Sequence, residues 1–126
     1  MEKLSLIALG GAMGAVLRWQ STAWVGRLTG ETWAGTLFVN VAGSALMGAL
    51  AVLMMEAFPG SWGRFAPFAM TGVLGAFTTF SAFSLDTLYL IERGRFEVAA
   101  AYINLSVLLS IGGLWLGLRL MRGLLA

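Results

Sequence analysis

The sequence predicts an all-α membrane protein with four transmembrane helices. The chain has 126 residues, of which 59% are hydrophobic and only 11% are charged, and its mean hydropathy is +0.85. Soluble domains carry roughly 25% charged residues. A helix that crosses a hydrocarbon core of about 30 Å needs roughly 20 residues, so four crossings use nearly the whole length. We therefore expect residues 1–126 to form a single transmembrane domain with no soluble part.

Four apolar stretches, separated by short polar joints, define the expected helices. They cover about residues 4–25, 33–57, 65–91 and 96–121. Glycine, proline and charged residues fill the joints, as in the turn Glu92-Arg93-Gly94-Arg95. Trp24, Trp33 and Trp62 lie near these joints. Indole rings favour the lipid headgroup layer, so their positions agree with the expected boundaries.

The basic residues outside the spans give almost no preference for one orientation in the membrane, although Lys and Arg normally mark the cytoplasmic side. We therefore expect a chain this small to insert both ways and to pair antiparallel with itself as a homodimer in the lipid bilayer. The alternative is that Arg119 and Arg122 fix one orientation. The basic residues expected on the same side of the membrane as the N-terminus are Lys3, Arg64, Arg119 and Arg122. Those expected on the other side are Arg27, Arg93 and Arg95.

Glycine is frequent, with 17 in the chain, and pairs of small residues recur four apart on expected helices. Such pairs let two helix backbones approach closely in lipid. They predict tight packing and support oligomerisation, although glycine and alanine are common in any transmembrane helix. The pairs are Gly10 and Gly14, Ser44 and Gly48, and Gly113 and Gly117.

Polar residues inside two spans recur every four residues and therefore stack along one helix face. Each of these side chains donates hydrogen bonds, and none is charged at neutral pH. A lane of such donors suits a small anion that exchanges its water shell stepwise without being trapped by a full positive charge. The alternative is hydrogen bonding that only joins helices. The two lines are Thr36, Asn40 and Ser44, and Tyr102, Ser106 and Ser110.

The third span has an unusual centre, where Gly72 and Gly75 precede the adjacent residues Thr78 and Thr79. These residues weaken a helix, and a break at mid-membrane is tolerated only where the freed backbone groups meet protein, water or an ion. Exposed carbonyls at a break can ligate a hard cation such as sodium. From these residues alone, an unbroken helix is as well supported as a broken one.

Two phenylalanines and two charged residues complete the candidate groups. Phe80 and Phe83 share one helix face, and their ring edges are positive toward an anion, although ordinary packing is the alternative. Arg18 and Asp86 are embedded in spans and should avoid lipid. Arg18 is expected either to bond carbonyls at a helix break or to face a wet vestibule, and Asp86 to line a vestibule wall. A direct pair of the two is the alternative.

The composition also excludes several classes of function. The chain has no Cys and no His, which removes disulfides, thiolate nucleophiles, imidazole bases and the usual zinc, haem and iron–sulfur ligands. No nucleophile and base pair can be assembled, so we expect no enzyme. The eight basic residues are dispersed, with no run that could follow a nucleic-acid backbone, so no nucleic-acid partner is expected.

Three segments carry a resemblance to a known family. They are Gly-Gly-Ala-Met-Gly-Ala-Val-Leu-Arg-Trp at 10–19, Gly-Thr-Leu-Phe-Val-Asn-Val-Ala-Gly at 35–43 and Gly-Val-Leu-Gly-Ala-Phe-Thr-Thr-Phe-Ser-Ala-Phe at 72–83. Across essentially its whole length the chain resembles the Fluc (CrcB) fluoride channels. The resemblance implies a passive, fluoride-selective channel of the bacterial inner membrane that lowers fluoride toxicity. It also implies an antiparallel dual-topology homodimer, a third helix broken at mid-membrane and a structural sodium ion at the dimer centre.

The resemblance assigns roles to individual residues. It implies that the backbone carbonyls of Gly75 and Thr78 ligate sodium and that the ring edges of Phe80 and Phe83 face fluoride. Arg18 matches the family's first-helix arginine. Ala82 departs from the family, because a threonine is common at that position. The polar pore residues that the resemblance implies are Asn40, Thr79, Tyr102, Ser106 and Ser110.

Two other functions are weighed against a fluoride channel. A small multidrug-type proton-coupled exporter has a similar length and also forms antiparallel dimers. Proton coupling in such exporters is associated with a membrane-embedded glutamate in the first helix. This chain has Arg18 in that helix instead. A subunit that only assembles is the other alternative, and it would dimerise without any ion flux.

Overall fold

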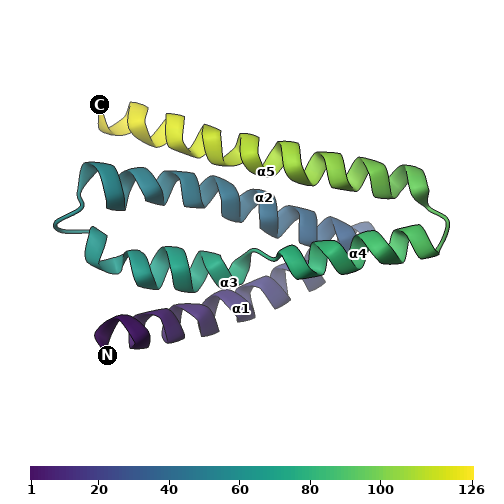
Figure 1. The fold of residues 1–126 in the computed structure, drawn as a ribbon, viewed down its shortest axis with the longest axis horizontal. Helices are drawn as coiled ribbons and strands as arrows, with labels where there is room; N and C mark the ends of the chain where they lie inside the picture. Colours follow the sequence, from purple (N-terminus) through teal and green to yellow (C-terminus); the bar gives the residue numbers. More distant parts are fainter.

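The computed structural model describes residues 1–126, and all of its regular structure is helical. Three long helices, α1 (Glu2–Thr29), α2 (Thr32–Ala51) and α5 (Phe96–Leu125), form most of the chain. All three run along the length of the molecule, and both termini lie at the same end (Figure 1). The expectation of an all-α protein is therefore confirmed.

Short helical segments connect α2 to α5. The π-helix η1 (Val52–Ala57) continues α2, and the 3-10 turn η2 (Gly63–Phe65) leads into the π-helix η3 (Pro67–Leu74). One further turn, α3 (Gly75–Phe77), ends at an extended pair, Thr78 and Thr79, before α4 (Phe80–Glu92) begins. The third expected span is thus a chain of segments rather than one regular α-helix.

Glycines make the two tight turns at one end of the bundle. Gly30 has φ of 76° and closes α1 by donating its N–H to the Gly26 carbonyl, and Gly94 has φ of 73° between α4 and α5. Residues other than glycine rarely adopt this left-handed backbone conformation. These positions explain why the joints contain glycine beside their charged residues.

Three helical stretches are long and apolar enough to cross a membrane, namely Thr32–Ala57, Gly63–Glu92 and Phe96–Leu125. The protein is therefore a multi-pass membrane protein. Helix α1 is also long, but Glu2, Lys3 and Arg18 make it less apolar than the other three. That α1 forms a fourth crossing stays a prediction.

The helices pack through glycines, which bring one backbone against another. A Cβ atom on Gly48 would overlap the Leu114 carbonyl oxygen, and one on Gly117 would overlap that of Ala45, so α2 and α5 approach closely. Gly10 and Gly14 meet the backbone of η3 in the same way. The small-residue pairs expected from the sequence therefore pack helices within one chain.

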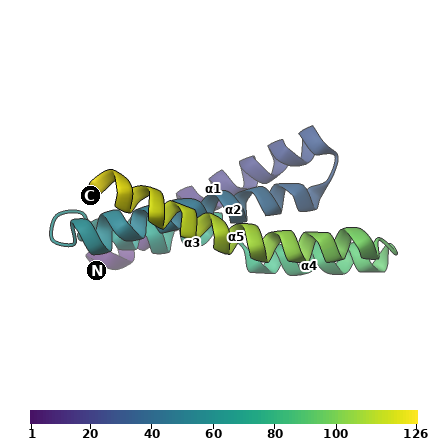
Figure 2. The same ribbon diagram turned by 90° about the horizontal axis from the view of Figure 1, so that it is seen from above.

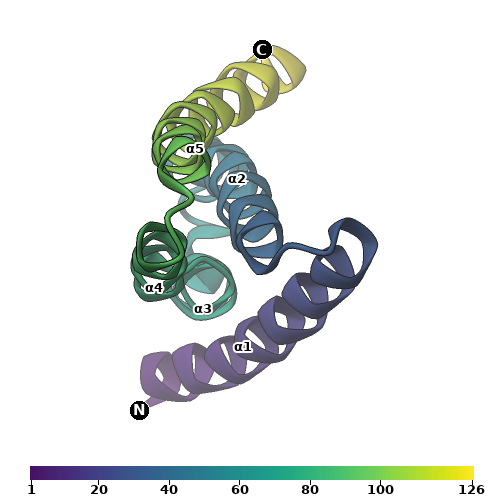
Figure 3. The same cartoon turned by 90° about the vertical axis from the view of Figure 1, so that its right-hand side faces the viewer.

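The end-on view shows α1 and α5 on opposite sides of the molecule, with α2, α3 and α4 between them (Figure 3). Seen from above, α1 diverges from α4 toward the end where α1 turns into α2 (Figure 2). Only 16 of 126 residues are buried, and many large apolar side chains of α1 and α5 are exposed. Such an exterior requires lipid or another apolar surface against it.

Two ion pairs connect the continuous stretch of α2 and η1 to α5, one near each end. Arg95 meets Glu31 just before both helices begin, and Arg122 meets Glu56 at the other end, each with a shortest N–O distance of 2.7 Å. Both arginines donate two hydrogen bonds to their carboxylate. Hydrogen bonding from Arg95 lowers the pKa of the Glu31 carboxyl below its usual range.

The close contact of α2 and α5 predicts a specific cost for side chains at Gly117. We expect Gly117→Ala to lower the free energy of unfolding by about 1–3 kcal/mol, because the added methyl group overlaps the Ala45 carbonyl oxygen. Gly112→Ala in the same helix is the matched control, because nothing lies within 4 Å of its added Cβ atom. Thermal unfolding in detergent compares the two. Equal unfolding temperatures would contradict the described packing.

The Glu31–Arg95 pair predicts a dependence of stability on pH. Because the pKa of Glu31 is lowered in the folded protein, the pair stabilises the fold above the ordinary glutamate value of about 4.3. This contribution is lost as the pH falls through the folded pKa. Unfolding temperatures of the wild type and Glu31→Gln should therefore differ at pH 7 and converge toward pH 3. Glu97→Gln is the control for a carboxylate without an ion pair, and a difference that stays constant with pH would contradict the prediction.

Candidate functional site

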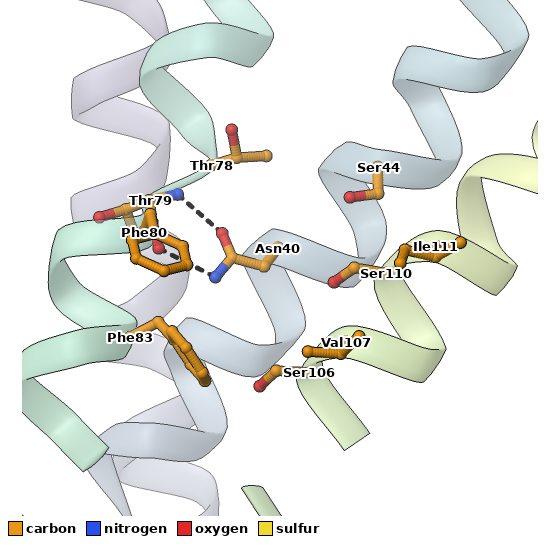
Figure 4. A pocket seen from close by; sticks show the side chains of 10 residues that line it. All are labelled: Asn40, Ser44, Thr78, Thr79, Phe80, Phe83, Ser106, Val107, Ser110 and Ile111. Carbon is orange, nitrogen blue, oxygen red and sulfur yellow. Dashed lines mark hydrogen bonds between the residues drawn. The ribbon is translucent and has the colours of Figure 1, made fainter. Parts of the chain in front are cut away.

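A pocket of about 350 Å³ lies where α2, α4, α5 and the extended pair Thr78-Thr79 meet. Figure 4 shows its side chains, which come from all of these segments. None of the lining residues is ionisable, so the pocket offers polar groups without a full charge. It is lined by Asn40, Ser44, Thr78, Thr79, Phe80, Phe83, Ser106, Val107, Ser110 and Ile111.

The helical chain is interrupted at the edge of this pocket. Thr78 has φ of −90° and ψ of 154°, and Thr79 has φ of −153° and ψ of 116°, so both residues are extended. The Thr79 hydroxyl oxygen then accepts the N–H of Ala82 at 3.1 Å and caps α4. A side-chain acceptor at this position satisfies one of the free N–H groups of a helix start.

Asn40 from α2 holds the interruption through two hydrogen bonds to one residue. Its Oδ1 accepts the Thr79 N–H at 2.7 Å, and its Nδ2 donates to the Thr79 carbonyl at 3.0 Å (Figure 4). Gly43, one turn further along α2, leaves room for the Thr78 methyl group. Asn40 therefore replaces, with one side chain, hydrogen bonds that a continuous helix would make with its own backbone.

The interruption also frees backbone carbonyls. In a continuous α-helix the Gly75 carbonyl would accept the N–H of Thr79, and the Thr78 carbonyl that of Ala82. Both N–H groups are instead used elsewhere, by Asn40 and by the Thr79 side chain. Carbonyl oxygens of unwound helices are suitable ligands for sodium. The two carbonyls that the sequence resemblance selects thus have the right chemistry for such an ion.

Arg18 lies at the same interruption. Its Nε donates to the Ala76 carbonyl at 2.9 Å, and neither ion pair of the chain includes it. Of the partners considered for Arg18, the structure shows the carbonyl at the break rather than Asp86. In a continuous helix the Ala76 carbonyl would accept the N–H of Phe80, so Arg18 compensates for another hydrogen bond of the interrupted backbone.

The α5 side of the pocket carries a buried hydroxyl group without a partner. Ser106 is 7% exposed, and its Oγ makes no hydrogen bond. Ser110 lies one turn further along α5 and also lines the pocket. Phe80 and Phe83 project from α4 into the same space (Figure 4), with ring centroids 5.5 Å apart. The pocket thus places hydroxyl donors of one helix and aromatic rings of another around one space.

Tyr102 lies outside the pocket lining, although it belongs to the same helix face as Ser106 and Ser110. It is 1% exposed, and its hydroxyl donates to the Asp86 carboxylate at 3.2 Å. Thr36 donates to the same carboxylate oxygen at 2.6 Å. The Tyr102 ring packs between Phe83 and Trp33, with centroid distances of 5.2 and 5.5 Å. Asp86 is therefore held by two hydroxyl groups beside the pocket.

The structure brings together six of the seven residues expected in the pore, all except Tyr102. Ser44 also lines the pocket, and its spacing from Asn40 places it on the same polar line, although the resemblance assigns it no role. Nothing in the sequence indicated Val107 and Ile111, which follow Ser106 and Ser110 and are apolar. The partners of Asp86 were missed as well, although Thr36 and Tyr102 are the first members of the two polar lines.

Comparison with known proteins identifies the family. Residues 5–118 match the family model described as CrcB-like protein, Camphor Resistance (CrcB). The chain belongs to the CrcB family. The resemblance seen in the sequence is therefore confirmed, and it extends over nearly the whole chain.

Several CrcB-family relatives carry the name "Fluoride-specific ion channel FluC". One from Cereibacter sphaeroides (strain ATCC 17029 / ATH 2.4.9) is 50% identical over 127 residues, which covers 100% of this chain and 99% of the relative. One from Ruegeria sp. (strain TM1040) is 51% identical and covers 94% of both chains. One from Rhizobium meliloti (strain 1021) is 45% identical and covers 98% of this chain and 99% of the relative.

The two hydrogen bonds of Asn40 predict that this side chain stabilises the interruption. We expect Asn40→Ala to lower the free energy of unfolding by about 2–3 kcal/mol, because both backbone groups of Thr79 lose a part-buried hydrogen-bond partner. Asn104→Ala is the control, because Asn104 bonds only its own helix on an exposed face. Thermal unfolding and hydrogen exchange of the Thr79 amide measure the effect. An unchanged exchange rate in Asn40→Ala would show that Asn40 does not hold the break.

Proposed function

We propose that this CrcB-family chain is a fluoride-selective passive channel of the bacterial inner membrane. The observation that carries the proposal is the Ser106 hydroxyl, which is buried in a polar, uncharged pocket and has no partner within the chain. A buried donor without a partner is costly unless a ligand or water accepts its hydrogen bond. Relatives of about half-identical sequence bear the name of a fluoride-specific channel, and that name supports fluoride as the ligand.

The pocket chemistry suits a small, strongly hydrated anion. Ser106, Ser110 and Ser44 offer hydroxyl donors that replace water around the ion. The rings of Phe80 and Phe83 present positive edges without offering a cation that would hold the anion too tightly. Passive flow through such a path follows the fluoride gradient outward and lowers the fluoride concentration in the cytoplasm. The named relatives are channels, so the proton-coupled exporter finds no support among them.

A second copy in the opposite orientation would complete the path. Phe80 is 79% exposed in the single chain, although it lines the pocket with its neighbour Phe83. The even distribution of basic residues on both sides permits both orientations. We propose an antiparallel dual-topology homodimer with four crossings in each chain, α1 included. The partner then covers the apolar faces that the single chain exposes.

The third helical stretch would hold a structural sodium ion at the dimer centre. The Gly75 and Thr78 carbonyls of both protomers are its proposed ligands, because neither carbonyl accepts its ordinary helical N–H. When bound, the ion supplies positive charge to the carbonyl end of an interrupted helix. The residues of the chain hold the break open: Asn40 binds both backbone groups of Thr79, and Arg18 binds the Ala76 carbonyl.

Fluoride efflux from proteoliposomes tests the channel directly. We expect purified protein to release fluoride rapidly in the presence of a potassium ionophore, without a proton gradient, while chloride stays inside. A fluoride electrode follows the efflux, and protein-free liposomes give the leak. Efflux that requires a proton gradient would indicate a coupled transporter. No efflux from folded dimers would favour a subunit that only assembles.

Variants of the pocket test the role of its residues. We expect Ser106→Ala to lower fluoride flux about tenfold or more, because an anion loses one hydrogen bond, while stability is unchanged because the hydroxyl has no partner in the chain. Phe80→Ile or Phe83→Ile should abolish flux while dimers persist. Ser84→Ala is the control, because that hydroxyl bonds the Phe80 carbonyl of its own helix. Wild-type flux in all three pocket variants would remove these side chains from the mechanism.

A further inference from the structure

Arg18 places an uncompensated positive charge at the interrupted helix. Both ion pairs of the chain use other residues, and Asp86 is bound by Thr36 and Tyr102. The only polar contact of the Arg18 side chain is the Ala76 carbonyl at 2.9 Å. A charged side chain within the bilayer is costly unless it is paired or hydrated. The Ala76 carbonyl that it faces is therefore one source of its stabilisation.

The carbonyl end of η3 and α3 provides that stabilisation. These two segments run without interruption from Pro67 to Phe77, and their C-terminal end points its carbonyls toward the break. Such an end is negative and attracts cations. Arg18 and a metal cation at the Gly75 and Thr78 carbonyls therefore use the same negative end. Ala76, which Arg18 binds, lies between the two carbonyl residues in the sequence.

We propose that Arg18 restricts the cation site at the break to monovalent ions. The proposal rests on the sodium site proposed above and specifies its selectivity. The repulsion between Arg18 and a bound cation doubles when the cation is divalent. The carbonyl ligands are neutral, whereas calcium sites in proteins usually include carboxylates that balance the charge. Arg18 also occupies the Ala76 carbonyl, which removes a further oxygen that a calcium ion would use.

Two substitutions separate the charge of Arg18 from its hydrogen bond. Arg18→Gln removes the charge and keeps an N–H donor, whereas Arg18→Lys keeps the charge on a different donor. The measurement is the thermal unfolding midpoint in detergent, titrated with NaCl or CaCl₂ at matched ionic strength in a buffer of a large organic cation. For the wild type and Arg18→Lys, we expect sodium to raise the midpoint and calcium to have little effect.

For Arg18→Gln we expect the ratio of the calcium to the sodium half-saturation concentration to fall about tenfold or more below the wild-type ratio. That is the effect of the one additional unit of charge on calcium, for a separation on the order of 10 Å and an effective dielectric constant near 20. An unchanged ratio of calcium to sodium half-saturation would overturn the proposal. If Arg18→Gln does not fold, the wild type still decides: calcium that stabilises it as effectively as sodium overturns the selectivity.

The same titration distinguishes this proposal from the channel function. Sodium that leaves the wild-type midpoint unchanged would disprove the cation site, and the role of Arg18 with it. Sodium stabilisation together with absent fluoride efflux would disprove the channel and leave the role of Arg18 intact. Gly11→Ala in α1 is the control substitution, because nothing lies within 4 Å of its added Cβ atom.

Discussion

The pair of hydrogen bonds between Asn40 and Thr79 is the interaction on which the rest of the site depends. Backbone groups that are not paired cannot be left in a hydrocarbon environment, where each costs several kcal/mol. A helix can stop at Thr78 only because Asn40 reaches across from α2 and binds both backbone groups of the next residue. The free Gly75 carbonyl follows from that replacement, and the Thr79 side chain, held at the break, then caps α4 and frees the Thr78 carbonyl.

Close backbone contact gives Asn40 its position. A short side chain spans the distance from α2 to the break only if the helix passes near it, and Gly43 permits this by leaving space for Thr78. Gly48 and Gly117 hold α2 against α5 in the same region of the fold, and ion pairs fix both ends of that contact. Small residues thus allow the helix backbones to approach closely, and this approach brings polar side chains within hydrogen-bond distance of their partners.

The distribution of charge around the pocket is as informative as the pocket itself. The single acidic residue near it, Asp86, is bound by two hydroxyl groups, and the nearby base, Arg18, faces a carbonyl. Neither residue lines the space. The pocket therefore offers an ion uncharged hydrogen-bonding groups rather than full charges. Such groups bind an ion strongly enough for it to enter and weakly enough for it to leave, as conduction requires.

The sequence by itself determined the helical class, the positions of the joints and the two polar faces, because composition and a period of nearly four residues depend only on local order. It also brought Asn40, Ser106, Phe80 and Phe83 forward as site residues. Only the tertiary structure decided the hydrogen-bond partners: Asn40 binds Thr79, Tyr102 and Thr36 bind Asp86, and Arg18 binds Ala76. These partners lie between 16 and 58 residues apart in the sequence. Periodicity assigns a side chain to a face of its own helix, whereas the partner depends on the neighbouring helix that this face meets, and helix packing sets that choice.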